Sequence, residues 1–517
     1  MHFSTVRMSS RTGSELFNSP PSRTPLYSAA AGQILAVLLA CIFLAYFALI
    51  GAGQWQADEY ADFGELARSG WHILLPRLKW SPRPFSEVLF FLYGALVNHL
   101  RQPLIIPFLG LLWIGLLVAA LLTWWKRRRR EHRENGWPDL LLGLALLASF
   151  VTGGPLLEMF YWPAGAVAYL PTLSATVLLF LQVVAGRLET PKGRAVCGVC
   201  LLIAASSTEA GATFVASYAA VQLIASTLVT RTTRDGCRRW IWWLLPAIVA
   251  VAVLIVLRLN RYESSEPIFG LVPNFARSSG AIVIASLRQG LLEMADTPNH
   301  YHAWFGIPAR VISRCLLALG AGVIWRFSRR MSTTIRWQIL GVVVAFLAAA
   351  LATISAAELH FGAECCARHE TLRRCWFMMS FAGIGMVLSS WPTPTRFAEG
   401  RRQFALSLGS LLLCAGAVTG WRARELLRTY RIYRPLHSMV EQNFRSGFDR
   451  GSSTMDFFPP PGRGLIVGAQ VDPGTYTLAT LHESNAQEYY LRFILAYFDK
   501  RTIHVHRTDA WLDNPHR

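Results

Sequence analysis

Long apolar runs separated by short polar segments dominate the pattern of this chain. Several runs approach the roughly 20 apolar residues that a helix needs to cross a bilayer. The pattern therefore predicts an all-α polytopic membrane protein with about eleven transmembrane helices. We place the spans at residues 29–53, 103–125, 138–151, 166–185, 195–207, 211–229, 240–257, 308–326, 336–356, 372–390 and 403–420.

The loops between these spans indicate the orientation of the chain. Five of them are rich in arginine and lysine: residues 126–133, 187–194, 231–239, 326–336 and 396–402. With eleven spans, all five lie on the side of the N-terminus, and the positive-inside rule makes that side the cytoplasm. The same parity places the segment after the first span and the C-terminus outside. Residues 1–28 are polar and are expected to form a disordered cytoplasmic N-terminus.

The first outer segment, residues 54–102, is too long to be a simple connector. Residues 57–68 predict a short helix that Gly70 ends, and a proline-rich break follows at 81–84. Residues 85–99 predict a second, strongly apolar helix. If that helix spanned the membrane, all five basic loops would move outside, so we expect it to lie along the membrane or to enter it shallowly.

Two of the spans, residues 138–151 and 195–207, are short for a full crossing. Non-helical backbone at membrane depth occurs only where protein covers it or where it lines a cavity. We therefore expect the segments that follow to enter a cavity that opens outward. They carry Glu158 and Glu209, and carboxylates at that depth are usually functional.

Composition agrees with a membrane protein, since 53% of the residues are hydrophobic and 16% are charged. The net charge of +19 is no indication of nucleic acid, because the positive charge lies in loops where the positive-inside rule explains it. Arginines on the outer side run against that rule. Arg83, Arg368 and Arg373, together with His369, therefore predict an anionic partner such as a phosphate.

Several motifs follow one another in a characteristic order. They are the acidic pair of Asp58 and Glu59 just after the first span, the two surface helices of the first outer loop, Trp80-Ser81-Pro82-Arg83-Pro84, residues 160–169, and Ser207-Thr208-Glu209. In order and topology, residues 29–420 resemble the GT-C superfamily of membrane glycosyltransferases, more narrowly its bacterial multipass members described as glucosyltransferase-like or of unknown function.

The resemblance implies an enzyme whose first outer loop, residues 54–102, is catalytic. In that superfamily a carboxylate of this loop is the base or a metal partner, so the role passes to Asp58 first and to Glu59 second. The donor is typically a sugar on a polyprenyl phosphate. The implied acceptor is a glycan or lipid of the cell envelope, at the outer face of the bacterial inner membrane.

The residue types suit this chemistry. Asp58, Asp62 and Glu65 share one helix face and could supply a base for the acceptor hydroxyl. Asp58 and Asp62 could instead hold a divalent cation such as Mg²⁺ or Mn²⁺. We assign Arg83, Arg368, His369 and Arg373 to the donor phosphate, and Asp62, Glu158, Trp162, Tyr169 and Glu209 to the cavity and the acceptor.

Other interpretations stay open on the sequence. The Asp58 cluster could be a solvated helix face, Trp162 and Tyr169 could be interfacial belt residues, and the outer arginines could pair with anionic lipid. A transporter or flippase for a lipid-linked saccharide would also carry such charges, as would a polysaccharide polymerase or ligase. Carboxylates of the first outer loop facing arginines favour transfer, whereas a related pair of broken helices favours transport.

The C-terminal tail, residues 421–517, is moderately polar and predicts a small α+β unit. Residues 464–469, 476–481 and 502–506 read as strands, and 486–498 as a helix with Tyr489, Leu491, Ile494 and Leu495 inward. The tail is short for an independent core, so we expect it to dock on the membrane domain from the outer side.

Overall fold

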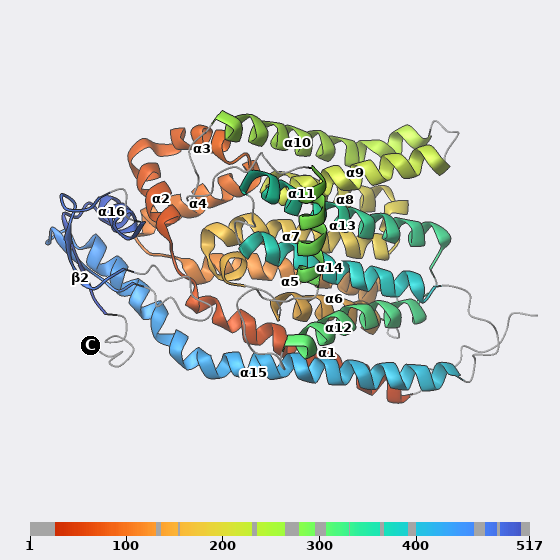
Figure 1. The fold of residues 1–517 in the computed structure, drawn as a ribbon. Coiled ribbons are helices and arrows are strands. Elements are labelled where there is room, and N and C mark those ends of the chain that lie inside the picture. The colour runs from red at the N-terminus through yellow and green to blue at the C-terminus, as the bar shows by residue number, and fades with distance from the viewer. Residues whose placement is uncertain are drawn as a thin grey trace, which may run out of the picture.

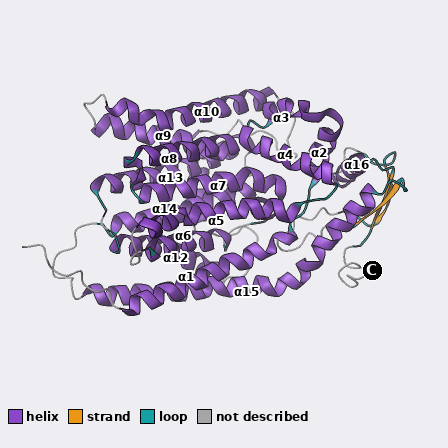
Figure 2. Ribbon diagram, turned by 180° about the vertical axis from the view of Figure 1, so that it is seen from behind, coloured by secondary structure: helices purple, strands orange, loops and turns teal. Residues whose placement is uncertain are grey.

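The computed structural model describes residues 26–130, 136–152, 156–229, 235–263, 279–294, 307–329, 331–361, 367–390, 400–459, 471–482 and 486–507. Within these ranges the chain is predominantly helical, with one small sheet near the C-terminus (Figures 1 and 2). Most helices run roughly parallel between two ends of a bundle, and α11 crosses this direction (Figure 1).

The chain forms its helices in the following order. The first half contains α1 (Leu26–Phe47), η1 (Ala48–Ala52), α2 (Ala57–Ser69), η2 (Gly70–Ile73), α3 (Leu74–Trp80), α4 (Pro84–Leu100), α5 (Ile105–Arg130), α6 (Trp137–Val151), the π-helical turn η3 (Leu157–Tyr161), α7 (Pro163–Val184), η4 (Arg187–Glu189), α8 (Pro191–Ser207) and α9 (Glu209–Val229). The second half contains α10 (Asp235–Glu263), α11 (Ser279–Met294), α12 (Ile307–Phe327), α13 (Thr333–Phe361), α14 (Ala367–Leu388), α15 (Gly400–Phe448) and α16 (Ala486–Phe498).

Each of the eleven predicted spans overlaps one of these helices. In the described ranges, five helical stretches are long and apolar enough to cross a membrane: Ala31–Ala52, Ile105–Arg128, Pro163–Val184, Trp242–Leu259 and Thr333–Leu359. The chain thus has the character of a helical membrane protein, and the count of eleven crossings stays a prediction.

Helix α6 lies at the centre of the bundle, where it contacts α1, α5, α12 and α14. Nearly all its residues are buried, and the only acidic side chain in its first turn, Asp139, is buried with them. On the outside, large apolar side chains such as Ile34, Leu111 and Ile248 are more than half exposed. A bundle with apolar side chains both in its interior and on its outer surface is suited to a lipid bilayer rather than to water.

The two surface helices of the first outer segment form as the sequence predicts. Helix α2 begins with a reciprocal cap between Gln56 and Glu59, and it ends at Gly70, whose φ of +63° suits glycine. Helix α4 exposes an apolar stripe, Phe85, Val88, Leu92 and Leu96, spaced three and four residues apart. Such a stripe suits a helix that lies along the surface of a membrane.

The last long helix differs from the prediction. We expected a span over residues 403–420 followed by the tail, but α15 continues without interruption from Gly400 to Phe448. It lies along α1 and reaches the end of the bundle that carries α2 and α16 (Figure 1). The first part of the predicted tail is therefore the continuation of this helix.

The rest of the tail is a three-stranded sheet with one helix. Strand β3 (Thr502–Val505) lies between β1 (Thr454–Phe457), which is parallel to it, and β2 (Gly474–Thr477), which is antiparallel. Helix α16 has the predicted bounds and buries Leu491, Ile494 and Leu495. The prediction that Tyr489 points inward is wrong, since this residue is 45% exposed and packs on Phe493. The predicted strand at 464–469 lies outside the described residues, and that at 476–481 is shifted toward the N-terminus.

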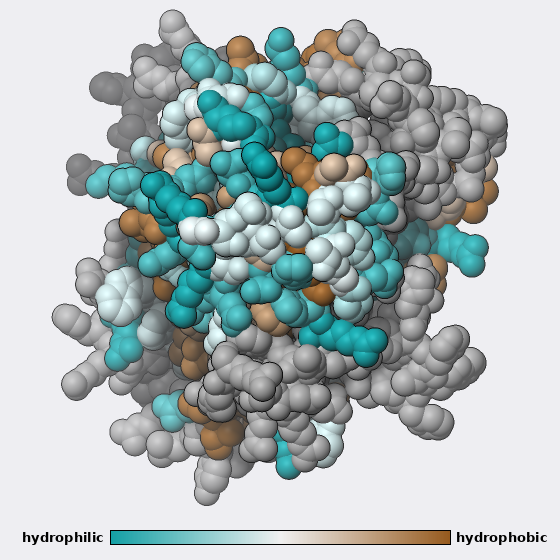
Figure 3. Space-filling model, turned by 90° about the vertical axis from the view of Figure 1, so that its left-hand side faces the viewer, coloured by the Kyte–Doolittle hydropathy of each residue, from teal (hydrophilic) through white to brown (hydrophobic). Residues whose placement is uncertain are grey.

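The tail docks on the first outer segment through aromatic side chains. Tyr497 of α16 packs on Trp55 and Tyr60, and its hydroxyl donates to the side-chain oxygen of Asn98 in α4 at 3.0 Å. Phe444 of α15 packs on the same Trp55 ring at 4.8 Å between centroids. Figure 3 shows mostly hydrophilic side chains on this end of the molecule. The segment that carries the acidic motif is therefore held between the bundle and the tail.

Candidate functional site

One recess gathers most of the residues that the sequence singles out. It encloses about 410 Å³, counting the part open to solvent, and we call it the site recess. Its lining consists of Asp58, Arg77, Arg83, Ser86, Glu87, Phe90, Trp162, Ala164, Gly165, Val167, Ala168, Tyr169 and Arg368. These residues come from α2, α3, the start of α4, the start of α7 and the start of α14, which are distant in the sequence.

The carboxylates of α2 have three different environments. Asp58 is exposed and lines the site recess, and its side chain makes no hydrogen bond or ion pair with the described part of the chain. Asp62 is buried, with 9% of its surface exposed. Glu65 lies away from the recess and pairs with Arg68 at 3.1 Å. Of the predicted acidic face, Asp58 alone faces the open space of the recess.

Glu59 lies behind the wall of the recess and is fully buried. Its carboxyl oxygens accept hydrogen bonds from the backbone N–H of Gln56 at 2.8 Å, the indole N–H of Trp162 at 3.0 Å and the backbone N–H of Ala164 at 2.9 Å. Burial raises the pKa of Glu59 to about 8; these hydrogen bonds oppose the rise and the charge of Asp58 adds to it. Glu59 thus joins the start of α2 to the start of α7 and holds Trp162 in place, which is a positioning role.

Arg77 bridges two carboxylates at one side of the recess. Its Nη2 lies 3.1 Å from Oδ2 of Asp62, and its Nε lies 3.4 Å from Oε2 of Glu87. Burial raises the pKa of Asp62 to about 7, an effect that Arg77 opposes and that Asp58 and Glu87 strengthen. Asp62 is therefore a group that can exchange a proton near neutral pH.

Arg83 joins the first outer loop to α9. It donates from Nε to Oε2 of Glu209 at 2.8 Å and from Nη2 to Oε1 at 2.7 Å, a bidentate pair. Glu209 follows Thr208, the single residue that separates α8 from α9. In addition, Ser86 donates to the carbonyl of Ser207 at 2.9 Å. The end of α8 at Ser207 is thus covered by the segment that contains Arg83 and Ser86.

Arg368, at the start of α14, closes the opposite side. Its guanidinium lies 5.1 Å from the centroid of the Trp162 ring and 3.7 Å from a carboxylate oxygen of Glu158. The predicted carboxylates Glu158 and Glu209 therefore each meet an arginine that lines the recess.

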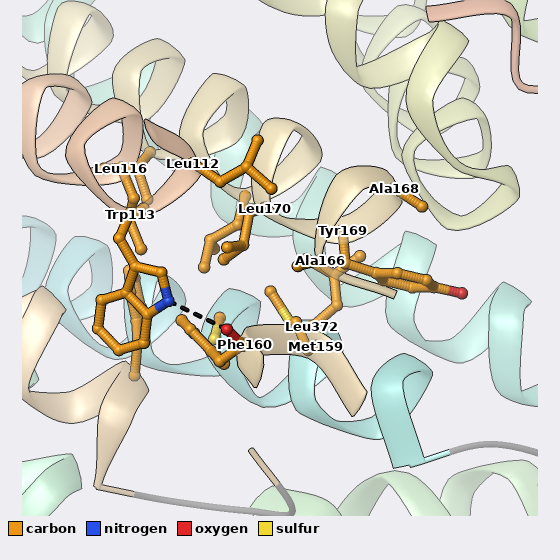
Figure 4. Close-up of a cluster of buried hydrophobic side chains, with 14 of the residues drawn as sticks. Leu112, Trp113, Leu116, Met159, Phe160, Ala166, Ala168, Tyr169, Leu170 and Leu372 are labelled. Carbon is orange, nitrogen blue, oxygen red and sulfur yellow. Dashed lines mark hydrogen bonds between the residues drawn. The ribbon is translucent and has the colours of Figure 1, made fainter. Parts of the chain in front are cut away.

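Tyr169 connects the recess to the apolar interior. Its ring lies in the buried cluster around Leu170 and Leu372, and its hydroxyl points away from that cluster (Figure 4). The hydroxyl lies 3.2 Å from ring nitrogens of His369. His369 thus touches the site through Tyr169 and does not itself line the recess.

Helices α4, α7 and α14 begin at Pro84, Pro163 and Ala367, beside the lining of the site recess. Helix α9 begins at Glu209, which binds Arg83 of that lining. The N-terminal end of a helix carries partial positive charge and unpaired backbone N–H groups, which favour anions. The approach of α7 to the preceding turn requires glycine, because a Cβ on Gly165 would lie 1.9 Å from the carbonyl oxygen of Glu158. These backbone dipoles add to the positive charge of the three arginines.

Two predicted roles do not match the geometry. Arg373 is only 1% exposed and makes a bidentate pair with Glu293 of α11, at 2.6 and 2.8 Å, so its guanidinium is committed to the bundle interior and does not line the recess. In the sequence Arg373 and Arg368 are both arginines near the start of the same predicted span, so the sequence could not show that only Arg368 lines the recess. Asp58 and Asp62 do not form a dedicated cation site, since Asp62 is bound to Arg77 and no group of three or more His, Cys, Asp or Glu among the described residues is arranged around a metal position.

No protein-family model, curated protein or solved structure matches this chain. The geometry of the site recess, together with the sequence, is therefore the basis for a functional assignment.

The sequence did not single out Glu87 or the convergence of helix starts. Glu87 lies four residues after Arg83, in the first turn of α4. An acidic residue there is ordinary, because it favours the helix dipole. Its position beside Arg77 depends on the fold of α3 against α4, which no local pattern reveals.

Proposed function

We propose that this protein is a membrane glycosyltransferase of the GT-C type, with eleven spans in the bacterial inner membrane. It moves a sugar from a polyprenyl-phosphate-linked donor to a hydroxyl of a cell-envelope glycan or lipid at the outer face. The supporting observation is that Asp58, an exposed carboxylate, shares one recess with three guanidinium groups and the starts of several helices.

In this proposal Asp58 is the general base. It takes the proton of the acceptor hydroxyl as the oxygen attacks the anomeric carbon of the sugar. The bond between that carbon and the phosphate oxygen breaks, and the phosphate leaves with the electron pair. Because Asp58 has no partner of its own among the described residues, its oxygens are available to the acceptor.

Arg77, Arg83 and Arg368 stabilise the charge on the departing phosphate, together with the helix N-termini. Each arginine already has a carboxylate neighbour, which fixes its position before substrate binds. Protonation of Asp62, whose pKa is about 7, would release Arg77 toward an anion. Trp162, which is part-exposed and lines the recess, provides the aromatic surface for a sugar ring. Since the carboxylates present do not form a metal site, we route no step through a cation.

A second function, transport of a lipid-linked saccharide, is favoured by one observation. The α6–η3–α7 and α8–α9 pairs are both interrupted beside the recess, and transporters often bind substrate between discontinuous helices. A flippase would move the donor without cleaving it, and a polymerase or ligase would join saccharides with no need for Asp58. Sugar transfer and its dependence on Asp58 therefore distinguish the functions.

The test uses purified protein in proteoliposomes and a panel of polyprenyl-phosphate sugars with a lipid or glycan acceptor. Transfer of radiolabelled sugar is measured for the wild type, for Asp58→Asn and for Glu65→Gln. The last is a matched control, because Glu65 is on the same helix but outside the recess. A positioned base contributes about 10²–10⁴-fold, so Asp58→Asn should lower turnover by that factor while Glu65→Gln stays close to wild type. Transfer that is unchanged in Asp58→Asn, or movement of intact donor without cleavage, would refute the proposal.

A further inference from the structure

Helix α2 presents Asp58 to the site recess on one face and rests on the C-terminal tail with the opposite face. At roughly 100° per residue, Tyr60 and Gly64 lie about 200° and 240° around the helix axis from Asp58. Both are buried, and α16 lies against this rear face of α2 (Figures 1 and 2). The helix that carries the exposed carboxylate is therefore supported by a segment that is distant in the sequence.

The contact between the rear face and α16 is aromatic and close. The ring of Tyr60 packs at 6.1, 5.7 and 6.0 Å between centroids on three rings of α16: Tyr490, Tyr497 and Phe498. Gly64 faces the same helix, since a Cβ added there would lie 3.6 Å from the Cα of Tyr497, in ordinary van der Waals contact. Because aromatic pairs prefer defined geometries, this contact resists sliding of one helix over the other.

Asn98 of α4 ties the two helices together. Its Nδ2 donates to the backbone carbonyl of Phe63 in α2 at 2.9 Å, and its Oδ1 accepts from the hydroxyl of Tyr497 at 3.0 Å. One side chain thus joins α2, α4 and α16. Since Ser86 and Glu87 in the first turn of α4 line the site recess, this junction connects the tail to two walls of the recess.

The start of α2 is held from the bundle side. Glu59 binds the indole N–H of Trp162 and the backbone N–H of Ala164. Contacts near one end of a helix do not determine the direction of its axis. The contact of α16 with Gly64, further along α2, supplies a second fixed point.

We propose that Tyr497 is a positioning residue of the site recess. Together with Tyr60 and Asn98 it sets the direction of α2, and so the place of Asp58. The inference rests on the proposed function, since the place of Asp58 affects turnover only if Asp58 takes part in transfer. A misplacement of about 1 Å at a reacting group can cost about a hundredfold in rate, so the tail governs turnover without touching the substrate.

The first test compares Tyr497→Ala with Tyr489→Ala in full-length protein in proteoliposomes. Tyr489 is the matched control, because it lies on the same helix and is exposed. Tyr497→Ala should lower kcat for sugar transfer at least about tenfold and leave KM for the donor within about twofold, since Arg83 is bound to α9 and not to α2. Exchange of the α2 amide hydrogens, followed by mass spectrometry, should be at least about tenfold faster. Thermal unfolding shows that each variant is folded at the assay temperature.

A reversible link distinguishes positioning from the simple loss of a side chain. Gly64→Cys together with Tyr497→Cys places two thiols at the contact, where the backbones are close enough for a disulfide. The reduced double variant should behave like Tyr497→Ala. Oxidation with copper phenanthroline should restore the contact and raise kcat at least about fivefold. The two single-cysteine variants receive the same oxidant, because Cys41 and Cys414 are exposed.

Unchanged kcat in Tyr497→Ala would overturn the inference and leave the proposed function standing. So would a loss of kcat without faster exchange in α2, or a disulfide that forms without restoring kcat. Failure of the two cysteines to form a disulfide would contradict the contact itself. Wild-type protein that transfers no sugar would refute the proposed function, and with it the role of Tyr497 in transfer. Faster exchange of α2 in Tyr497→Ala would in that case still show that the tail orders this helix.

Discussion

The two ends of the bundle hold charge in different ways. Around the site recess Arg77 meets Asp62 and Glu87, Arg83 meets Glu209 and Arg368 meets Glu158. Asp58 lines the same recess without an arginine partner among the described residues, and Glu59 lies behind its wall. Glu59 and Asp62 have raised pKa values, so bound protons neutralise part of the negative charge of this cluster. Near the other end of α7, Asp139 is buried and its oxygens accept hydrogen bonds from Arg127, Arg329 and Trp325. The first arrangement contains groups that can exchange protons and leaves one carboxylate exposed, whereas the second fixes a carboxylate inside the bundle.

The largest expected difference in the free energy of unfolding is between substitutions of Asp139 and of Asp58. Asp139→Asn removes the charge that Arg127, Arg329 and Trp325 bind, and removal of one partner from a buried ion pair costs about 3–5 kcal/mol. Asp58→Asn changes an exposed residue, for which a change within about 0.5 kcal/mol is expected. Unfolding in mixed micelles measures both. Equal stability losses would show that the two carboxylates do not differ as described.

Arg83 and Glu209 should be energetically coupled. Loss of a hydrogen bond to a charged group costs about 1.5–3 kcal/mol, so Arg83→Gln and Glu209→Gln should each lower the free energy of unfolding by that amount. Because the two side chains bind one another at 2.7 Å, the double variant should lose less than the sum of the two. Additive losses would mean that each side chain is stabilised by other groups.

The raised pKa values of Glu59 and Asp62 predict the pH dependence of stability. Their folded-state values, about 8 and about 7, lie above the ordinary values of 4.5 and 3.8, so the folded protein binds the extra protons. The contribution of these two groups to the free energy of unfolding is therefore fully present below about pH 4. It decreases as the pH rises to about 8, with a slope of up to about 1.4 kcal/mol per pH unit for each group.

Thermal unfolding between pH 5 and pH 8 measures this slope, relative to wild type, in Glu59→Gln and Asp62→Asn. Each variant should flatten it. Glu65→Gln, which changes an exposed carboxylate on the same helix, should leave the slope unchanged over this range. A slope that persists in both of the first two variants would assign the protons to other groups.

The smallest effect concerns the docking of the tail. Tyr497→Phe removes the hydrogen bond to Asn98 but keeps the aromatic packing, and should cost about 0.5–1.5 kcal/mol. Tyr489→Phe is the control, because Tyr489 is exposed and should change stability little. Equal effects of the two substitutions would indicate that the hydrogen bond does not contribute to docking.

Much of this arrangement could be predicted from the sequence where a local signal exists. A helix-stopping glycine at position 70 predicts the end of α2, and inward apolar residues such as Leu491, Ile494 and Leu495 predict α16. The parity of the predicted spans places the segments that carry Asp58, Arg83, Trp162 and Arg368 on one side. The structure gathers these four residues in one recess.

The sequence does not predict features that depend on tertiary contacts. Hydropathy marks the apolar part of α15 but not its end, since a polar helix can continue beyond a membrane span. The sequence pattern around an arginine does not show whether its guanidinium binds a ligand or a carboxylate of the protein. Arg373 therefore looked like a phosphate ligand until the structure paired it with Glu293. Glu59 and Asp58 are adjacent in the chain, yet helix rotation buries one and exposes the other.

The most direct measurement is the structure of the Asp58→Asn protein with a polyprenyl-phosphate sugar bound, determined by electron cryomicroscopy in a lipid nanodisc. The account predicts density for the phosphate within hydrogen-bond distance of Arg77, Arg83 or Arg368 and for the anomeric carbon beside Asn at position 58. Arg373 should keep its pair with Glu293. A donor bound elsewhere, with the site recess unchanged and empty under saturating donor, would contradict the assignment of this recess as the site of sugar transfer.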